Sequence, residues 1–344
     1  MSKISVLTAV YNDEAHIRKC LDSLCSQTLE DIQIICIDDH STDSSLSILK
    51  EYASRDPRIV VLEQPENLGQ AIARNEGIKI ADGEFITMLD SDDWFAPDAL
   101  EKAYEALHES PECDCALFKL MLCYPEDEGD GIRMEEFVNH TTHKLMVGID
   151  AFVLSLDQSI HGLYLARAEL FREYPYDTSC RLYSDDNTTC IHYLHSRNVV
   201  FCDGEYYYLK HKDASTAKPS ILRFDYMYAN LNLKRTLERE SEAGMLGSHS
   251  DSQKILDFYE SHRWLIVIDC YYFYYLYRKQ FSQEECQAIK ERFKDILQTI
   301  EPRRISWNLR IKPGYTPVKR WWLFKTIENF YFFLKHKFSP SDHF

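Results

Sequence analysis

The stretch Phe85-Ile86-Thr87-Met88-Leu89-Asp90-Ser91-Asp92-Asp93-Trp94 decides the fold expected of this sequence. Its first five residues are mostly apolar and rich in β-formers, which predicts a buried strand. Three carboxylates follow within four residues, and such charge beside an apolar strand is costly unless a cation lies there. Carboxylate oxygens suit Mg²⁺ or Mn²⁺, which keep further positions for water or phosphate. The alternative is an acidic turn in which Asp92 or Asp93 caps a helix that begins near Pro97.

Strands alternate with helices over the first third of the chain. Apolar runs predict strands at 3–10, 32–37, 58–62, 85–89 and 115–122. The segments between them have the apolar spacing of amphipathic helices. This alternation predicts a doubly wound, mostly parallel α/β sheet whose ligands bind at the carboxyl ends of the strands. Tyr11, Asp39 and Asp90 each follow such a strand, so we expect them to meet at one edge.

Composition narrows the class of protein. The 344 residues allow one large domain or two ordinary ones, and a hydrophobic fraction of 45% supports a real core. A net charge of −16 argues against nucleic-acid binding, which requires a basic face. The segment from Glu301 onward differs, with nine Lys and Arg against three Asp and Glu.

The cysteines and the apolar runs bear on cellular location. The eleven cysteines form no CxxC pair and no metal-ligand spacing, so we expect reduced, mostly buried thiols and a cytoplasmic protein. The chain enters a strand directly after its first residues, which predicts no signal peptide. The sequence contains no run of 18 uncharged apolar residues, so we expect no transmembrane helix.

The first strand–helix turn excludes two nucleotide-binding classes. The turn Ala9-Val10-Tyr11-Asn12 has no glycine, and no GxxxxGK[ST] motif occurs. A P-loop NTPase and a dinucleotide-dependent dehydrogenase are therefore poor fits. Without a glycine-rich loop, a diphosphate must be held by a metal, by side-chain cations and by the backbone amides that are available, and Arg74 is a candidate cation.

Four motifs occur in a fixed order: Ala9-Val10-Tyr11-Asn12, then Asp38 to Asp43, then Asn67-x-Gly69 with Ala73-Arg74-Asn75-x-Gly77, and then Leu89 to Trp94. In spacing and order they resemble the family 2 glycosyltransferases, which have the GT-A fold. The resemblance covers about residues 3–120 and continues more weakly to about 216. Two positions depart from the family pattern, because Ala9 stands where proline is usual and His40 where glycine is usual.

The resemblance implies a metal-dependent, inverting transfer of a hexose-type sugar from a nucleotide-diphosphate donor, with a UDP-sugar favoured. It also implies roles for individual residues: a base pocket lined by Ala9 and Tyr11, a nucleobase contact from Asp39, a ribose and metal contact from Asp90, and a metal ligand at Asp92. Mn²⁺ or Mg²⁺ is the expected cofactor.

The segment Arg181-Leu182-Tyr183-Ser184-Asp185-Asp186-Asn187 resembles the family's Glu-Asp motif. The resemblance implies that Asp185 is the general base that deprotonates the acceptor hydroxyl. Ser184 replaces the usual glutamate, so Asp186 is the alternative base. An acidic helix N-terminus capped by Ser184 would have the same sequence.

A tyrosine-rich strand at 205–209 leads into the basic sequence Lys210-His211-Lys212. The family often closes such a loop over the diphosphate, which makes Lys210 and Lys212 candidate phosphate ligands. His211 is a candidate metal ligand, and a solvated or structural histidine is the alternative.

Aromatic residues dominate two later segments. Residues 264–277 have helical spacing, which predicts core packing rather than sugar stacking. Residues 318–338 alternate aromatic with basic residues, a pattern that suits either peripheral contact with an anionic membrane or a packed C-terminal helix.

We therefore predict a GT-A catalytic domain at residues 1–216 and a helical C-terminal region at 217–344. The expected function is sugar transfer to a glycan or lipid-linked saccharide in cell-surface polysaccharide synthesis, in the cytoplasm or at the inner face of the membrane. A non-catalytic nucleotide-sugar-binding protein is one alternative. A sugar-nucleotide pyrophosphorylase is another, although it needs a glycine-rich first loop. The donor sugar, acceptor and linkage are not predicted.

Overall fold

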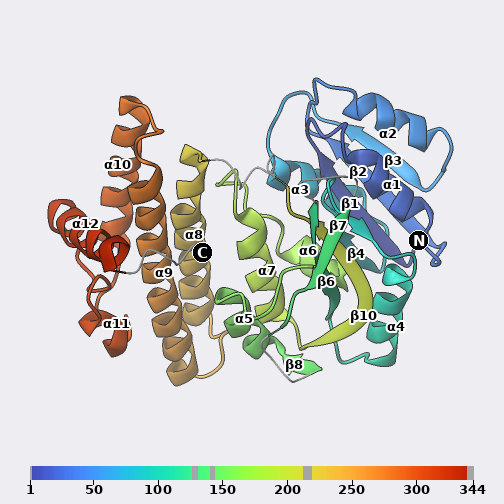
Figure 1. The fold of residues 1–344 in the computed structure, drawn as a ribbon. Helices are drawn as coiled ribbons and strands as arrows, with labels where there is room; N and C mark the ends of the chain where they lie inside the picture. Colours follow the sequence, from blue (N-terminus) through green and yellow to red (C-terminus); the bar gives the residue numbers. More distant parts are fainter. Residues whose placement is uncertain (1, 126–130, 140–143, 212–218, 339–344) are drawn as a thin grey trace. The chain divides into compact units, whose positions relative to one another are not determined.

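The computed structural model describes residues 2–125, 131–139, 144–211 and 219–338 (Figure 1). The chain divides into two compact units, Met1–Ala217 and Lys218–Phe344, called here the N-terminal unit and the C-terminal unit. Each is described by itself. The assignment of catalysis to residues 1–216 stays a prediction at this point.

The N-terminal unit is built on one mixed sheet, which within the described residues has ten strands. Their bounds are β1 Ile4–Val10, β2 Ile32–Asp38, β3 Ile59–Glu63, β4 Phe85–Met88, β5 Trp94–Phe95, β6 Cys115–Pro125, β7 Ile132–Glu136, β8 Leu145–Val147, β9 Tyr164–Arg167 and β10 Asn198–Leu209. The strand order is β3-β2-β1-β4-β9-β6-β10-β5, with β7 beside β6 and β8 beside β10.

The first four positions of the sheet are parallel, as the alternation of strands and helices predicts. The parallel register places Val10 opposite Asp38, so the carboxyl ends of β1 and β2 lie together. The short strand β9 then inserts antiparallel between β4 and β6, which the sequence did not reveal. The predicted α/β class is confirmed, with a sheet that is mixed beyond β4.

Helices cover both faces of this sheet, because successive side chains of a strand point to opposite faces. The helices are α1 Ile17–Cys25, α2 Ser45–Ala53, α3 Gln70–Ile80, α4 Ala99–Glu109, α5 Gly148–Leu156, α6 Ala168–Glu173 and α7 Ser184–His195. Leu21 of α1 and Leu100 of α4 share a core cluster with Val6 of β1. Helix α3 packs on the other face through Gly77, where a Cβ would lie 2.9 Å from Ile37 Cδ1. This close approach explains the glycine.

The C-terminal unit is helical and closes around an aromatic core. Its elements are η1 Ile221–Phe224, α8 Asp225–Glu242, α9 His249–Tyr277, α10 Gln283–Thr299, α11 Trp307–Ile311 and α12 Trp321–Phe338. Helices α8, α9 and α10 lie side by side (Figure 1). Trp264 and Tyr271 of α9 are almost fully buried, which confirms the predicted core role of that aromatic segment.

The last helix has two kinds of aromatic position. Phe324 and Phe332 of α12 are buried in the core of the C-terminal unit, whereas Trp322, Phe330 and Phe333 are exposed. The packed-helix alternative therefore accounts for one side of α12 only. Within the described residues, every helix is too short or too polar to span a lipid bilayer.

Candidate functional site

Three carboxylates follow β4, and each has a different partner. Asp90 lies against Arg74, Asp92 against His211, and Asp93 against Tyr206 and the backbone of Leu209. The predicted helix-cap alternative for Asp92 or Asp93 is wrong, because the residue at the N-cap position of α4 is Asp98. The acidic cluster therefore joins β4 to α3 and to the end of β10.

Arg74 on α3 is the buried cation of this cluster. Its side chain is only 4% exposed, and Nη2 donates to Asp90 Oδ1 at 2.5 Å. On its other side, Nη1 lies 3.9 Å from Asp185 Oδ2 at the start of α7. Burial alone would lower the pKa of Arg74, but the charges of Asp90, Tyr176 and Asp185 raise it instead. One guanidinium thus joins the residue predicted near the ribose to the predicted general base.

Asp90 receives a second donor from the same helix, since Gln70 Nε2 donates to its Oδ1 at 3.1 Å. Burial raises the pKa of Asp90, and the carboxylates of Asp92 and Asp185 add to this rise, while Arg74 opposes it. Sequence reasoning missed Gln70, whose position one turn before Arg74 was the available signal.

Asp92 and His211 form the pair expected of metal ligands. His211 Nε2 lies 2.9 Å from Asp92 Oδ2, and both side chains remain partly exposed. The ring of His16, on the residue before α1, lies 4.7 Å from the His211 ring between centroids. His16 is held in turn by Asp13, whose Oδ1 lies 2.6 Å from its Nδ1.

This donor set fits a divalent ion that shares its shell with substrate. Within the described ranges no group of three or more His, Cys, Asp and Glu side chains could hold a metal by itself. Asp92 and His211 supply one oxygen and one nitrogen. An ion of Mg²⁺ or Mn²⁺ type takes few protein ligands when phosphate oxygens and water fill its other positions. The pair is suited to an ion that arrives with a diphosphate.

Asp93 holds the acidic turn to the end of β10. Its Oδ1 accepts the backbone N–H of Leu209 at 2.8 Å, and its Oδ2 accepts the Tyr206 hydroxyl at 2.7 Å. Burial raises the pKa of Asp93 well above its usual value, and the charges of Asp90 and Asp92 add to the rise. This carboxyl fastens the end of β10, and with it His211, to the acidic turn.

Asp39 holds the loop before α3. Its two oxygens accept the backbone N–H groups of Leu68 and Gly69 at 2.9 and 2.8 Å. Gly69 has a φ of 93°, the conformation that glycine adopts most easily. Arg181 reaches the same loop, donating to the Asn67 backbone and side-chain oxygens at 2.9 and 2.7 Å. These contacts explain the Asn67-x-Gly69 motif.

Asn75 positions the segment that leads to α7. Its side chain donates to the Tyr176 carbonyl and accepts the Tyr176 N–H, both at 2.9 Å. Helix α7 then starts after Tyr183, whose φ is 65°, so Ser184 is the first helical residue rather than the cap. Asp185 in its first turn has a side chain that is 49% exposed, so its carboxylate is accessible to solvent.

The remaining predicted residues lie around this centre. Ala9, the last residue but one of β1, is half-buried, and Tyr11 just beyond the strand is 50% exposed. Lys210 Nζ lies 4.3 Å from the centroid of the Tyr208 ring, and burial lowers its pKa. Lys212 lies outside the described residues. His16, Arg181 and Tyr206 were not predicted as part of the site.

Similarity to known proteins indicates the family of the N-terminal part of the chain. Residues 5–161 match the sequence profile of Glycosyl transferase family 2. The chain carries a family 2 glycosyltransferase domain.

Two curated relatives illustrate the likeness. Poly(ribitol-phosphate) beta-glucosyltransferase of Bacillus spizizenii is 37% identical over 217 residues, which cover 61% of this chain and 33% of that protein. Glycosyltransferase GlyG of Streptococcus pneumoniae is 29% identical over 241 residues, 66% of this chain and 75% of that protein. The chain spans a third or less of the length of the first three curated relatives that it matches.

Solved structures extend the likeness to the fold of the whole chain. Residues 1–349 of TarS from S. aureus, in complex with UDP-GlcNAc, align with a TM-score of 0.73 and 19% identity. The alignment covers 96% of this chain and 91% of that one. The family 2 domain therefore has the expected GT-A fold, followed by a helical region.

Proposed function

We propose that this family 2 domain is an inverting, metal-dependent glycosyltransferase that moves a sugar from a UDP-sugar to a cell-surface polysaccharide precursor. The observation that carries the proposal is the position of Arg74 between Asp90 and Asp185. Donor binding and base catalysis must act within one site, and this guanidinium brings the residues proposed for the two tasks together.

The donor half of the site comprises the residues at the strand ends. We assign the nucleoside to Ala9, Tyr11 and Asp39, the ribose to Asp90, and the diphosphate to Arg74, Lys210 and Lys212. Asp92 and His211 are the proposed ligands of Mn²⁺ or Mg²⁺. A divalent ion there supplies positive charge beside the departing diphosphate. The contact between Asp92 and His211 supports this assignment.

The acceptor half depends on Asp185. Its exposed carboxylate takes the proton of an acceptor hydroxyl, whose oxygen then attacks the anomeric carbon opposite the leaving diphosphate and inverts that centre. Arg74 at 3.9 Å and the Asp186 N–H, which donates to Asp185 Oδ1 at 3.1 Å, hold the carboxylate in place. Asp186 remains the alternative base.

The acceptor and the cellular site are inferred from relatives and from composition. One relative is named a poly(ribitol-phosphate) glucosyltransferase, and the TarS structure holds UDP-GlcNAc. We propose a polyol-phosphate, saccharide or glycolipid acceptor and action in the cytoplasm at the inner face of the membrane. The exposed Trp322, Phe330 and Phe333 support peripheral membrane contact through residues 318–338.

Transfer and donor binding must be measured separately. We expect Asp185→Asn to lower kcat by about 100-fold or more, because proton transfer is lost, while the affinity for UDP stays within about twofold. The neighbouring Asp186→Asn is the matched control. If Asp186→Asn loses turnover and Asp185→Asn keeps it, the base is Asp186. Donor binding without turnover in the wild-type protein would favour a non-catalytic nucleotide-sugar-binding protein.

A further inference from the structure

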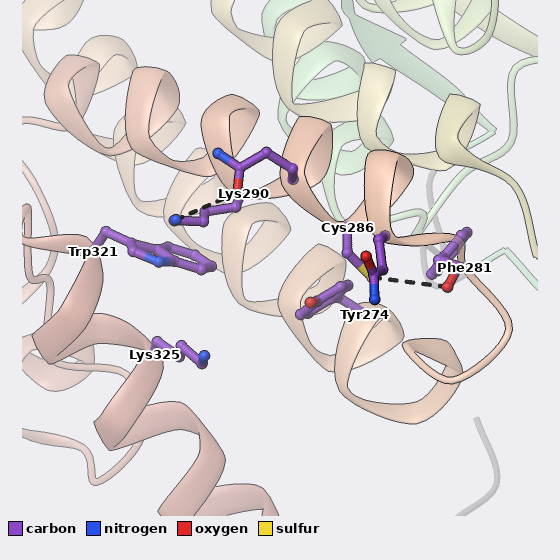
Figure 2. A pocket seen from close by; sticks show the side chains of 8 residues that line it. Tyr274, Phe281, Cys286, Lys290, Trp321 and Lys325 are labelled. Atoms are coloured by element: carbon purple, nitrogen blue, oxygen red, sulfur yellow. Dashed lines mark hydrogen bonds between the residues drawn. The ribbon is translucent and has the colours of Figure 1, made fainter.

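The C-terminal unit contains a groove of about 270 Å³, and two of its lining residues, Trp321 and Lys325, belong to the segment proposed above for membrane contact. One face of α10 forms a wall, opposite the first two turns of α12 and the end of α9. In Figure 2, Cys286 and Lys290 come from α10, Trp321 and Lys325 from α12, and Tyr274 from the end of α9. The size is near the lower end of small-molecule sites, roughly 300 Å³, so it suits one saccharide unit.

The ammonium groups of the two lysines at this groove, Lys290 and Lys325, are available to bind an anionic ligand. Within the part of the chain that the structure describes, neither Lys290 nor Lys325 forms an ion pair, and Lys290 Nζ contacts only the neutral Gln287 Oε1 at 3.4 Å. The nearby carboxylate of Glu291 is engaged by Lys294, whose Nζ lies 2.9 Å away. Two ammonium groups on facing helices match a phosphate, which accepts several hydrogen bonds.

The groove also has a rigid aromatic wall. Trp321 is half-buried and stacks on Phe293, with ring centroids 5.5 Å apart and an interplanar angle of 27°. Tyr271 packs edge-on against the same indole at 6.0 Å. A fixed aromatic ring beside side-chain amides such as Gln287 suits the C–H face and the hydroxyls of a sugar or polyol.

Charge is divided unequally between the two units, which favours an anionic occupant in the second. Residues 1–217 carry 18 Lys and Arg against 40 Asp and Glu, a formal net charge of −22. Residues 218–344 carry 21 against 15, a net charge of +6. A chain of phosphate esters is repelled by the first unit and attracted by the second.

We propose that the groove formed by α9, α10 and α12 is an accessory site for a phosphate-bearing saccharide or polyol unit of the acceptor chain. The two lysines bind the phosphate, and Trp321 with Tyr274 contacts the C–H face of the neighbouring unit. The inference rests on the proposed transferase function for the identity of the occupant. The residues that line the groove are the evidence for a ligand that carries a phosphate beside a sugar or polyol.

The test uses the full chain and a ribitol phosphate oligomer as the probe. Binding is measured by calorimetry for the wild type, for K290E/K325E, and for the control K254E/K312E, which reverses two exposed lysines outside the groove. Alkylation of Cys286 by iodoacetamide gives a second readout, because this half-exposed thiol lines the groove. Cys25, a half-exposed thiol of the N-terminal unit, is the internal reference.

We expect K290E/K325E to weaken oligomer binding at least tenfold, and the control pair less than threefold. Bound oligomer slows alkylation of Cys286 at least fivefold and leaves Cys25 unchanged. Equal weakening in both pairs, or no protection of Cys286, overturns the inference. Protection by phosphatidylglycerol vesicles but not by the oligomer also overturns it, in favour of a lipid headgroup. Stabilisation by UDP is recorded on the same samples, so that failure of the groove and failure of the donor site are distinguished.

Discussion

Glu328 of α12 gives a prediction whose magnitude follows from the structure. Its side chain is fully buried, and within the described residues neither carboxylate oxygen has a hydrogen-bond partner. Burial raises the pKa of this carboxyl from 4.5 to about 8. Between these two pH values the unfolded chain has released a proton that the folded chain keeps. The free energy of unfolding therefore falls by about 1.4 kcal/mol per pH unit, roughly 5 kcal/mol in all.

The contribution of protonated Glu328 to the free energy of unfolding is fully present below the unfolded pKa of 4.5, and it is lost as the pH rises toward 8. Glu328→Gln replaces the protonated carboxyl by a neutral amide of the same shape. We expect the variant to match the wild type within about 1 kcal/mol at pH 5, and to exceed it by about 3–4 kcal/mol at pH 8.

The assay is urea unfolding at pH 5, 6.5 and 8, followed by tryptophan fluorescence. Four of the five tryptophans lie in residues 218–344, so the signal reports mainly the C-terminal unit. Glu284→Gln, which removes an exposed carboxylate from the same unit, is the control and should keep the wild-type pH dependence. If the wild type and Glu328→Gln showed parallel curves between pH 5 and 8, the reasoning on Glu328 would be refuted.

Three further predictions concern the candidate site. Arg74→Met leaves Asp90 and Asp185 without their shared cation, so we expect urea unfolding at pH 7 to show a loss of about 3–5 kcal/mol of stability, and we expect no measurable sugar transfer. Unchanged stability would contradict the buried pairing. Asn75→Ala removes both hydrogen bonds to the Tyr176 backbone, so we expect it to lower the free energy of unfolding by about 1–3 kcal/mol and to lower kcat more than donor affinity. A wild-type kcat would show that this segment does not position the base. His211→Ala should weaken Mn²⁺ binding in the presence of UDP about tenfold or more, measured by electron paramagnetic resonance, and equal affinity would exclude His211 as a ligand.

The beginning of the fold could be predicted because its signals are local. The strands β1, β2 and β4 are mostly apolar and are buried on both faces, as expected of strands covered by helices on each side. Strand β9 has only four residues, and nothing in Tyr164–Arg167 indicates that it pairs with β4, about eighty positions earlier in the chain. Its place in the sheet is set by tertiary packing, which a short apolar run does not reveal.

The sequence predicts that the acidic cluster has partners, but it does not predict which side chain pairs with which carboxylate. The charge run at Asp90–Asp93 is visible in the sequence, because three carboxylates after an apolar strand require partners. Which partner each takes is a long-range property: Arg74, His211 and Tyr206 approach from α3 and the end of β10. Asp93, the most buried of the three, holds the acidic turn to the end of β10.

The most direct test of the account is the thermal unfolding of the full chain with UDP, GDP and UDP-GlcNAc, each with and without Mn²⁺. A ligand that binds only the folded state stabilises it by about 2.7 kcal/mol at 100 times Kd. We predict a clear rise in Tm with UDP and Mn²⁺ together, its loss in Asp92→Asn, and its retention in the exposed control Asp203→Asn. No rise with any nucleotide, or a rise that Asp92→Asn leaves intact, would contradict a metal-assisted donor site at the end of β4.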